Sequence, residues 1–372
     1  MKSRLGVALV ALVLVAGLGC TPEIVEPPAV TVSDEPREDR AVAPTPPEDP
    51  TPEVVWPLTG MIAEGVPGAD LGRPAVAVKI ENTADGRPQK GLEYADIVFD
   101  EYINAGCLRL VAVFHSTLPE AVGPVRSARN QDPNIMGSFD TPIFSSGANR
   151  GVQETFNGLE QVLFGNALYT YNDYLRFSHG FTRKSWEEVN KPLEFRLWGN
   201  TQVFAEEAEE AGAGPAPQQF DYAYPAALAT AAVEGEPVAT MDLEYSACGH
   251  PHWDWNAESG VWDRFEFSDR HVTMDGTPIQ AANVVILRVD VAYTQRKIPE
   301  SFVVVSDAPG FVATHGAVQP ILWTKSSRTG GYILETLDGD PVLLAPGQTW
   351  IELVPLSGAW DKATITFDGE VQ

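Results

Sequence analysis

The N-terminal segment decides which part of this chain is able to build a hydrophobic core. Residues 5–19 form an unbroken run of 15 apolar or glycine residues that ends directly at Cys20. This run is shorter than the roughly 20 residues that cross a bilayer, and its length is typical of a signal peptide. We therefore predict that residues 1–20 are a signal peptide and take no part in the fold.

Cys20 is the candidate modified residue. A Cys that follows a small residue, here Gly19, at the end of an apolar run resembles the lipobox of bacterial lipoproteins, in which this Cys becomes the acylated N-terminus. The usual pattern has Leu three places before the Cys, whereas this chain has Gly17 there and Leu18 one place later. An ordinary cleaved signal peptide and an uncleaved anchor are the alternatives. The lipobox predicts a palmitate-type anchor that holds the protein on the extracytoplasmic face of the cell membrane.

Residues 21–57 are predicted to be a disordered tether. They contain ten Pro, nine acidic residues and no aromatic residue before Trp56. Such a segment cannot bury enough apolar surface to offset the entropy lost on ordering. It therefore acts as an extended spacer between the membrane and the folded part of the chain.

The whole chain is strongly acidic, with 25 Lys and Arg against 51 Asp and Glu and a net charge of -26. Binding to DNA or RNA requires Lys and Arg that displace counterions from the phosphates, so nucleic acid is excluded as a partner. A site for any other anion has to be a local group of Arg residues in an unfavourable background field.

Residues 58–205 are predicted to form an N-terminal domain of the α+β or α/β class with a mixed sheet. Strands are expected at 75–80, 95–102, 108–115 and 141–146, and helices at 131–138 and 149–157. The strand at 75–80 is almost continuously apolar, which is typical of a strand buried on both faces. Alternation of strands and helices of this kind favours a mixed sheet.

Residues 206–220 are predicted to be a linker, because 212–217 is a Gly/Pro cluster. Residues 221–372 are predicted to form a second, mostly β domain resembling a small sandwich or barrel. Of its three clustered Trp residues, Trp253, Trp255 and Trp262, at least two are favoured as core residues over a surface for stacking on sugars or a partner protein. The expected strands lie at 241–245, 252–255, 261–267, 283–290, 301–305, 319–324, 332–337 and 349–354.

Apart from Cys20, the chain contains two Cys residues, Cys107 and Cys248. In an oxidising exterior the two could pair and join the halves of the chain. Two buried free thiols are favoured over this pair, because a free Cys packs well as a small apolar residue.

Several segments, taken together, resemble the YerB-like bacterial lipoproteins. The most specific is Gly-Pro-Val-Arg-Ser-Ala-Arg at 123–129, and the others lie at 72–82, 87–92, 95–99, 108–114, 323–328 and 344–350. The resemblance extends in order over nearly all of the chain after residue 58. It implies a membrane-tethered protein of two domains from Gram-positive-type bacteria. Both halves of that family are domains of unknown function, so the resemblance fixes no reaction and no cofactor.

The chain also departs from the pattern of that family at two places. Related proteins tend to have a Pro-His-Asn element where this chain has Pro-Leu-Glu-Phe at 192–195, and a His near the position of Ser145. Neither His is present here. If the family uses them in catalysis, this chain is a member that only binds, or one with altered chemistry.

The segment at 123–129 contains the candidate anion site. Arg126 and Arg129, with the Ser127 hydroxyl, are expected between a strand and a helix, where a phosphate or carboxylate binds well. Arg109 and Asn149 are further candidate donors from neighbouring segments. The alternative is that the Arg residues only form ion pairs with acidic residues of the same domain.

Asp96 and Asp100 are the candidate acidic pair. Four residues apart on one strand, they share a face, so they are candidates for general acid and base or for partners of the Arg residues. Solvation or pairing with Arg is the more common fate of such residues.

Cys248, His250, His252 and Asp254 alternate along one predicted strand, a pattern that suits zinc. Gly249 and Pro251 interrupt that strand, so we predict no metal site and a hairpin surface instead. The sequence contains no GxSxG, P-loop, dinucleotide-binding or HExxH motif, and no cofactor is predicted.

Three functions remain open at this point. The first is a cell-envelope binding or scaffold lipoprotein for an anionic cell-wall polymer or an envelope protein. The second is an envelope hydrolase or transferase that acts on a phosphorylated or carboxylated glycan at Arg126 and Arg129. The third is a structural module that interacts through its Trp-containing β domain.

Overall fold

The computed structural model describes residues 52–166, 175–293, 298–359 and 363–372. Cys20, the predicted signal peptide and most of the predicted tether lie outside these residues. Within the described ranges, no helix is both long and apolar enough to cross a membrane.

The first half of the chain alternates strands with short helices. Its strands are β1 (Val76–Glu81), β2 (Ile97–Tyr102), β3 (Leu108–Phe114), β4 (Ile143–Phe144), β5 (Leu163–Gly165), β6 (Arg176–Phe177), β7 (Phe181–Arg183) and β8 (Leu197–Gly199). Its helices are α1 (Asp132–Met136), α2 (Arg150–Thr155), α3 (Trp186–Val189) and α4 (Thr201–Glu210). The predicted mixed sheet is confirmed, since β1 is antiparallel to β3 and parallel to β4.

The second half is mostly β, as predicted. Its only helix longer than one 3-10 turn among the described residues is α5 (Thr230–Glu234). The early strands are β9 (Asp221–Tyr222), β10 (Glu236–Pro237), β11 (Thr240–Glu244), β12 (Pro251–Asn256), β13 (Val261–Glu266), β14 (Asp269–Arg270) and β15 (Gln280–Ala281). The later strands are β16 (Asn283–Tyr293), β17 (Pro299–Phe302), β18 (Val305–Thr314), β19 (Ala317–Lys325), β20 (Ile333–Thr336), β21 (Leu343–Leu344), β22 (Thr349–Ser357), β23 (Thr364–Phe367) and β24 (Glu370–Val371).

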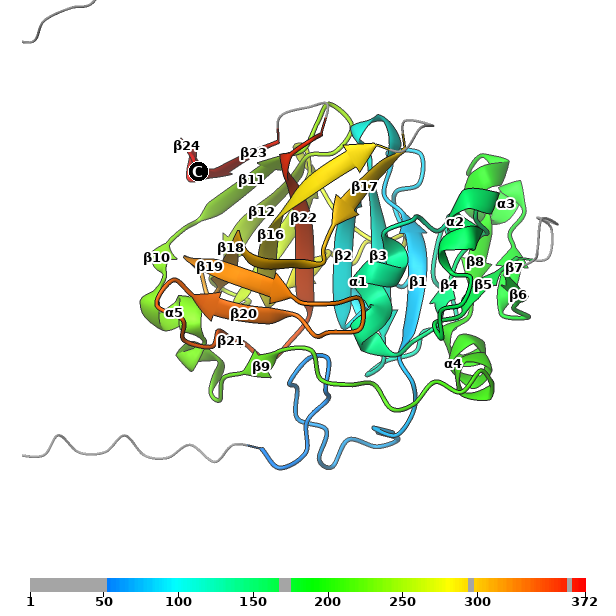
Figure 1. Ribbon diagram of the computed structural model, residues 1–372, viewed down its shortest axis with the longest axis horizontal. Coiled ribbons are helices and arrows are strands. Elements are labelled where there is room, and N and C mark those ends of the chain that lie inside the picture. The colour runs from blue at the N-terminus through cyan, green and yellow to red at the C-terminus, as the bar shows by residue number, and fades with distance from the viewer. Residues whose placement is uncertain (1–51, 167–174, 294–297, 360–362) are drawn as a thin grey trace, which may run out of the picture. The chain divides into compact units, whose positions relative to one another are not determined.

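The halves that were predicted as separate domains share one sheet. Among the described residues, 13 strands pair in the order β10-β19-β18-β16-β22-β2-β3-β1-β4-β5-β6, with β17 and β20 beside β16 and β19. In Figure 1, β22 from the end of the chain lies between β16 and β2. Both of its pairings are parallel, and parallel strands need cover on both faces. Because both halves contribute strands to this sheet, the described residues from 52 onward form one compact unit, with no division at 206–220.

A second sheet, in the order β14-β13-β12-β11-β23-β24 with β15 beside β13, completes the core. Its inner face contributes the fully buried Trp253 and Trp262, so the prediction that at least two of the three Trp residues are core is confirmed. The Trp253 ring meets the Trp350 ring of β22 edge to face, with the centroids 5.4 Å apart. The small independent sandwich or barrel predicted for the second half does not form, because its strands divide between the two sheets.

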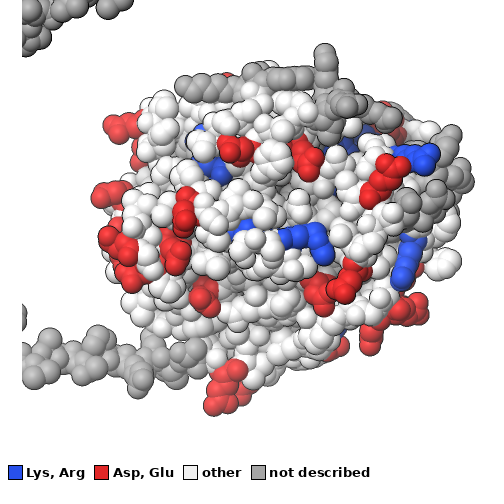
Figure 2. All heavy atoms as spheres, viewed as in Figure 1, with Lys and Arg blue, Asp and Glu red and all other residues white. Residues whose placement is uncertain are grey.

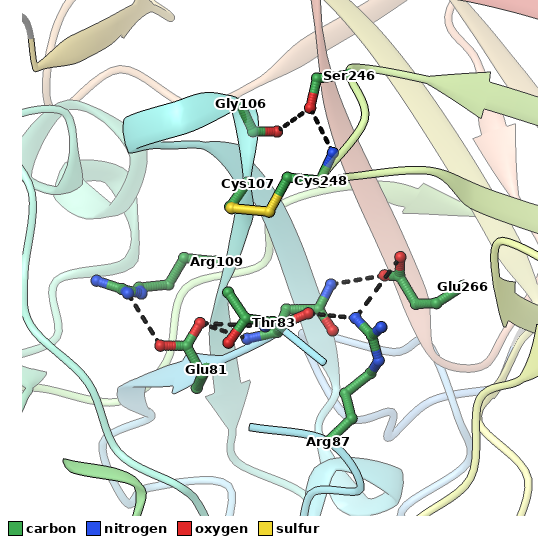
Figure 3. Close-up of a disulfide and its surroundings, with 10 residues drawn as sticks. Glu81, Thr83, Arg87, Gly106, Cys107, Arg109, Ser246, Cys248 and Glu266 are labelled. Carbon is green, nitrogen blue, oxygen red and sulfur yellow. Dashed lines mark hydrogen bonds and ion pairs between the residues drawn. A yellow bond between two sulfur atoms is a disulfide. The ribbon is translucent and has the colours of Figure 1, made fainter. Parts of the chain in front are cut away.

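Cys107 and Cys248 form a disulfide, so the favoured prediction of two free thiols was wrong. Cys107 lies between β2 and β3, Cys248 lies between β11 and β12, and their Cα atoms are 4.6 Å apart. Beside the disulfide, the Ser246 hydroxyl donates to the Gly106 carbonyl at 2.7 Å (Figure 3). The cross-link therefore joins the two halves of the chain at one end of β3.

The folded part begins earlier than the predicted end of the tether. Trp56 is buried, its ring meets the His115 ring at 5.2 Å, and the Arg73 guanidinium lies over it at 5.6 Å. A large apolar side chain gains more from this contact than the entropy of ordering a few residues costs.

Candidate functional site

Residues 122–129 run as an extended segment beside β1. The Arg126 amide donates to the Lys79 carbonyl at 2.9 Å, and the Ser146 amide donates to the Arg126 carbonyl at 2.9 Å. Helix α1, which was expected to supply its N-terminus to the candidate site, has only five residues and begins at Asp132. A helix of this length offers no N-terminal anion site, so the candidate donors are the side chains of the segment.

Glu81, at the end of β1, lies between two of the candidate Arg residues. One Glu81 oxygen, Oε2, accepts from Arg109 Nη2 at 3.0 Å and lies 2.8 Å from Arg126 Nε. The other, Oε1, accepts the amides of Asn82 and Thr83. Figure 3 shows the Arg109 side chain directed at this carboxylate. Burial acts to raise the pKa of Glu81, but the two guanidinium groups and the two amides outweigh burial and lower it.

The Arg129 guanidinium pairs with no carboxylate in the described part of the chain, although the Arg129 amide donates to Asp132 Oδ2 at 2.7 Å. Its guanidinium donates to the carbonyls of Ser127 and Ala128 at 3.3 and 3.0 Å. Burial and the positive charges of Arg129 and Arg126 together lower the pKa of Arg109 to about 10, against the attraction of Glu81 and Glu101. Arg109 and Arg126 thus share one carboxylate, and the nearby Arg129 guanidinium has carbonyl partners only.

The three Arg side chains differ in exposure. Arg109 is 4% exposed, the Arg126 side chain is 26% exposed, and Arg129 is half-buried. Ser127 is also half-buried, and its hydroxyl lies 3.3 Å from the Ser146 hydroxyl. The group therefore reaches the surface through Arg126, Ser127 and Arg129.

Both departures from the family pattern border this group. Arg126 donates to the Glu194 carbonyl at 3.0 Å and lies over the Phe195 ring at 5.0 Å. Ser145 immediately precedes Ser146, and its own hydroxyl donates to the carbonyls of Gly147 and Phe164. The two segments where the resemblance led us to expect His thus both lie beside the Arg group.

Asn149 does not contact the three Arg residues. It is the N-cap of α2, where its side chain accepts the Val152 amide at 3.1 Å. The neighbouring Arg150 is highly exposed and pairs with Glu154. Capping a short helix accounts for Asn149, because Asn is among the preferred N-cap residues.

Asp96 is buried at the start of β2, away from the Arg side chains with which it was expected to pair. Its carboxylate accepts the amides of His115 and Ser116 at 2.5 and 2.9 Å, and also the Ser116 hydroxyl. Burial raises the pKa of Asp96 to about 6. These contacts hold the turn after β3 in place, so Asp96 has a structural role.

Asp100 binds an Arg of the second half of the chain. Arg264 of β13 donates to Asp100 Oδ2 at 2.6 Å and to Glu266 Oε1 at 2.7 Å, and its Nε lies 3.9 Å from Glu352. All four side chains are buried, and the guanidinium lies over the Trp350 ring at 4.5 Å. We name Arg264, Asp100, Glu266 and Glu352 the Arg264 network.

The Arg264 network contains more carboxylate than one guanidinium neutralises. Burial acts to lower the pKa of Arg264, but Glu266, Asp100 and Glu352 outweigh burial and raise it. Burial raises the pKa of Asp100 and raises that of Glu352 to about 7, against the attraction of Arg264. Glu352 accepts hydrogen bonds from the Tyr245 hydroxyl and the Trp253 indole, both at 3.1 Å.

Replacing Glu352 with Gln is expected to stabilise the chain most at high pH. The pKa of Glu352 is raised by folding from 4.5 to about 7. The stabilisation that this raised pKa gives the folded parent is therefore fully present below about pH 4.5 and is lost as the pH rises through about 7. Gln does not titrate and shows no such loss. Gln keeps an acceptor for Trp253 and offers an amide to the Tyr245 oxygen. Urea unfolding of parent and variant should show a difference that grows by about 2 kcal/mol from about pH 5 to pH 8.

Parent and variant contain the same other titrating groups. The difference between their unfolding free energies at each pH therefore excludes the contribution of those groups. These include the buried His115 and His271, whose pKa values are lowered by burial and whose effect on stability has the opposite sign. A difference that stays constant over this range would show that Glu352 is ionised in the fold throughout.

The predicted hairpin surface at 250–254 is present, and Cys248 is used by the disulfide. His252 lies between two carboxylates, with Nδ1 2.9 Å from Asp242 and Nε2 2.6 Å from Asp254. Among the described residues, no group of three or more His, Cys, Asp or Glu is placed to hold a metal ion.

Sequence reasoning missed Glu81, the carboxylate that Arg109 and Arg126 share. Glu81 and Arg109 are direct partners in the antiparallel register of β1 and β3. That signal becomes visible only after the pairing of the two strands is known. The acidic residues named instead, Asp96 and Asp100, belong to a strand on the far side of β3.

Comparisons with known proteins identify the same family as the resemblance seen in the sequence. The model of the "Protein of unknown function (DUF3048) N-terminal domain" matches residues 58–212, and that of the corresponding C-terminal domain matches 241–351. The chain is 28% identical over 317 residues to the "Putative lipoprotein YerB" of Bacillus subtilis (strain 168), covering 80% of this chain and 86% of that one.

The fold is also that of a solved structure. The crystal structure of YerB protein from Bacillus subtilis matches with a TM-score of 0.68 at 22% sequence identity, over 84% of this chain and all of that chain. The Arg group and the Arg264 network described above thus lie in a known fold whose function is not assigned. The chain belongs to the DUF3048 family, with both the N-terminal and the C-terminal domain of that family present in order.

Proposed function

We propose that this protein is a lipid-anchored lipoprotein of the cell envelope that binds an anionic polymer at Arg109, Arg126 and Arg129. The ligand group is a carboxylate or a phosphate, because a planar guanidinium binds either one with two parallel hydrogen bonds. Arg126 and Arg129, with the Ser127 hydroxyl, meet the ligand at the surface, and Arg109 supports them from below.

One observation carries the proposal. The chain has twice as many acidic as basic residues, and acidic side chains dominate the face drawn in Figure 2. Three Arg residues nevertheless lie together: Arg109 and Arg129 both donate to the Ser127 carbonyl, and Arg109 and Arg126 share Glu81. Among the described residues, the Arg129 guanidinium pairs with no carboxylate. A purely structural ion pair needs no further cation beside it, whereas the Arg129 guanidinium is left without a counter-charge in the described residues. An anionic ligand supplies the charge that is lacking.

The cellular address is supported by the sequence and by the relative. The apolar run before Cys20 fits a lipoprotein signal peptide, and the Bacillus subtilis relative is named as a putative lipoprotein. An acyl chain on Cys20 and the Pro-rich tether then place the folded part outside the membrane. A disulfide between Cys107 and Cys248 suits that oxidising location.

Binding is favoured over hydrolysis or group transfer. The acid and base that such an enzyme needs were expected from Asp96 and Asp100, but these contact the turn after β3 and Arg264 instead. The segments at 192–195 and around Ser145, where the resemblance led us to expect His, contain none in this chain. The group therefore offers donors for an anion, and its one carboxylate, Glu81, is occupied as the acceptor of two Arg side chains and two amides.

Changing Arg126 to Ala is expected to lower the affinity for polyphosphate or poly-γ-glutamate. Truncating one partner of a charge pair of this kind costs about 2–5 kcal/mol, so binding by calorimetry should weaken by well over tenfold. The matched control is Arg150→Ala, which removes the same charge from an exposed, separately paired residue. Equal affinity of the two variants would contradict the proposal.

The anchor is tested at Cys20. A Cys20→Ser variant is expected to appear in the culture medium or to retain its signal peptide, because it lacks the acyl acceptor. Membrane fractionation with an antibody against the folded part distinguishes the results. Normal trimming together with full membrane retention would contradict the lipid anchor.

A further inference from the structure

The smaller sheet has a hollow on its outer face that the anion site does not use. The hollow has a volume of about 550 Å³ and lies over β11, β12 and the turn between β13 and β14. Its lining side chains alternate with the buried Met241, Leu243 and Trp253, which face the core. Because these elements are different from those around Arg126, the inference below does not rest on the proposed function.

One side of the hollow is polar and is held in place by hydrogen bonds. His252 lies between Asp242 and Asp254, and the His250 Nε2 atom lies 3.3 Å from the same Asp242 oxygen, Oδ1. One oxygen of each carboxylate is thus engaged by imidazole. The described residues form no hydrogen bond to the other two, Asp242 Oδ2 and Asp254 Oδ2, and both side chains are 43% exposed.

The other side of the hollow is aromatic. The Phe265 ring meets the His252 ring at 5.6 Å, and the Phe267 ring meets the His250 ring at 5.4 Å, both edge to face. Phe267 is 42% exposed and has a φ of 57° in the two-residue turn between β13 and β14. Such turns normally use Gly, Asn or Asp, because a bulky residue is strained there. Phe267 therefore combines a strained backbone with an exposed ring beside fixed polar groups, and strain of this kind is typical of functional positions.

We propose that this hollow binds an uncharged sugar ring. The apolar C–H face of a pyranose covers the Phe267 ring, and neighbouring hydroxyl groups donate to the free oxygens of Asp242 and Asp254. Carboxylates accept such hydrogen bonds strongly, and an aromatic ring next to them supplies the large apolar contact. Two carboxylates at the surface of the hollow repel anions, which distinguishes this ligand from that of the Arg group.

An organic ammonium ion is the main competing ligand. It would also find carboxylates and an aromatic face. The sugar is favoured because the two oxygens without a hydrogen bond, Asp242 Oδ2 and Asp254 Oδ2, belong to carboxylates on opposite sides of the His252 ring and so form two separate acceptor sites. The vicinal hydroxyl groups of a sugar match two free acceptors on either side of one imidazole.

The test uses saturation-transfer NMR on the full chain with glucose, maltose, N-acetylglucosamine and its β-linked dimer as probes, and butylamine as the cationic probe. At least one sugar should give a signal at millimolar concentration, and butylamine should give none. The Phe267→Asn variant should lose the sugar signal and keep or raise the unfolding temperature, because Asn tolerates a positive φ. Asp254→Asn, which replaces an acceptor by a donor, should weaken the signal.

Phe302→Asn is the matched control, since Phe302 is a similarly exposed Phe in β17, outside the smaller sheet. It should leave the sugar signal unchanged. Absence of signal from every sugar, a signal from butylamine alone, or a sugar signal that survives Phe267→Asn would each overturn the proposal. A clear fall in unfolding temperature for Phe267→Asn would assign the ring to structure instead.

Discussion

An Arg264→Met variant is expected to lose about 3–5 kcal/mol of folding free energy, the usual cost of removing one partner of a buried ion pair. Arg264 neutralises Asp100 and Glu266 through bonds of 2.6 and 2.7 Å and lies near Glu352, and all these side chains are buried. Met fills much of the same volume, so the loss comes mainly from the charge left unpaired. Urea unfolding monitored by Trp fluorescence measures it, since Trp253 and Trp350 adjoin the guanidinium.

The control for Arg264 is Arg270→Met. Arg270 lies on the neighbouring strand β14, pairs with Asp263 and is 45% exposed, so its removal should cost well under 1 kcal/mol. If Arg264→Met does not fold, Arg264→Lys, which keeps the charge and loses the fork geometry, should fold with reduced stability. Equal small losses for Arg264→Met and Arg270→Met would contradict the central role given to the network.

Removing the disulfide is expected to cost about 4 kcal/mol. Cys107 and Cys248 are 141 residues apart, and a cross-link that closes so long a loop restricts the unfolded chain strongly. A Cys107→Ala, Cys248→Ala double variant should fold, because the shared sheet is intact, and should unfold at a lower urea concentration. The parent in reductant should match the double variant.

Thiol titration is the accompanying measurement. The unfolded parent without reductant should show no free thiol at Cys107 and Cys248. Two free thiols, or identical unfolding with and without reductant, would contradict the cross-link.

Strand positions followed well from local sequence, but the pairing of distant strands did not. The apolar segments at 75–80, 108–115 and 349–354 are strands β1, β3 and β22, as predicted. The strand predicted at 301–305 covers only the first residue of β18. The rest of β18 was not predicted, because Pro309 and Gly310 normally interrupt strands. Nothing local indicates that β22 pairs with β2, about 250 residues earlier in the chain, and therefore one unit was predicted as two domains.

The candidate site was predicted in part, for a similar reason. An unusual density of Arg in one short segment identified Arg126 and Arg129, and the fold brings Arg109 to them. The partners were not predicted, because ion pairs depend on tertiary contacts. For Arg264 a local signal existed: Trp262, Arg264 and Glu266 alternate along β13, so a buried Trp262 places the other two in the core.

The most direct test of the anion site is the unfolding temperature of Arg129→Gln, measured with and without polyphosphate. Arg129 pairs with no carboxylate in the described residues, so its charge is not required to hold the fold. We expect polyphosphate to raise the unfolding temperature of the parent by binding the folded state. Without polyphosphate, the variant should have the same unfolding temperature as the parent. Addition of polyphosphate should raise the unfolding temperature of the variant only slightly. A parent unaffected by polyphosphate, or a variant that melts early and still gains as much as the parent, would contradict the account.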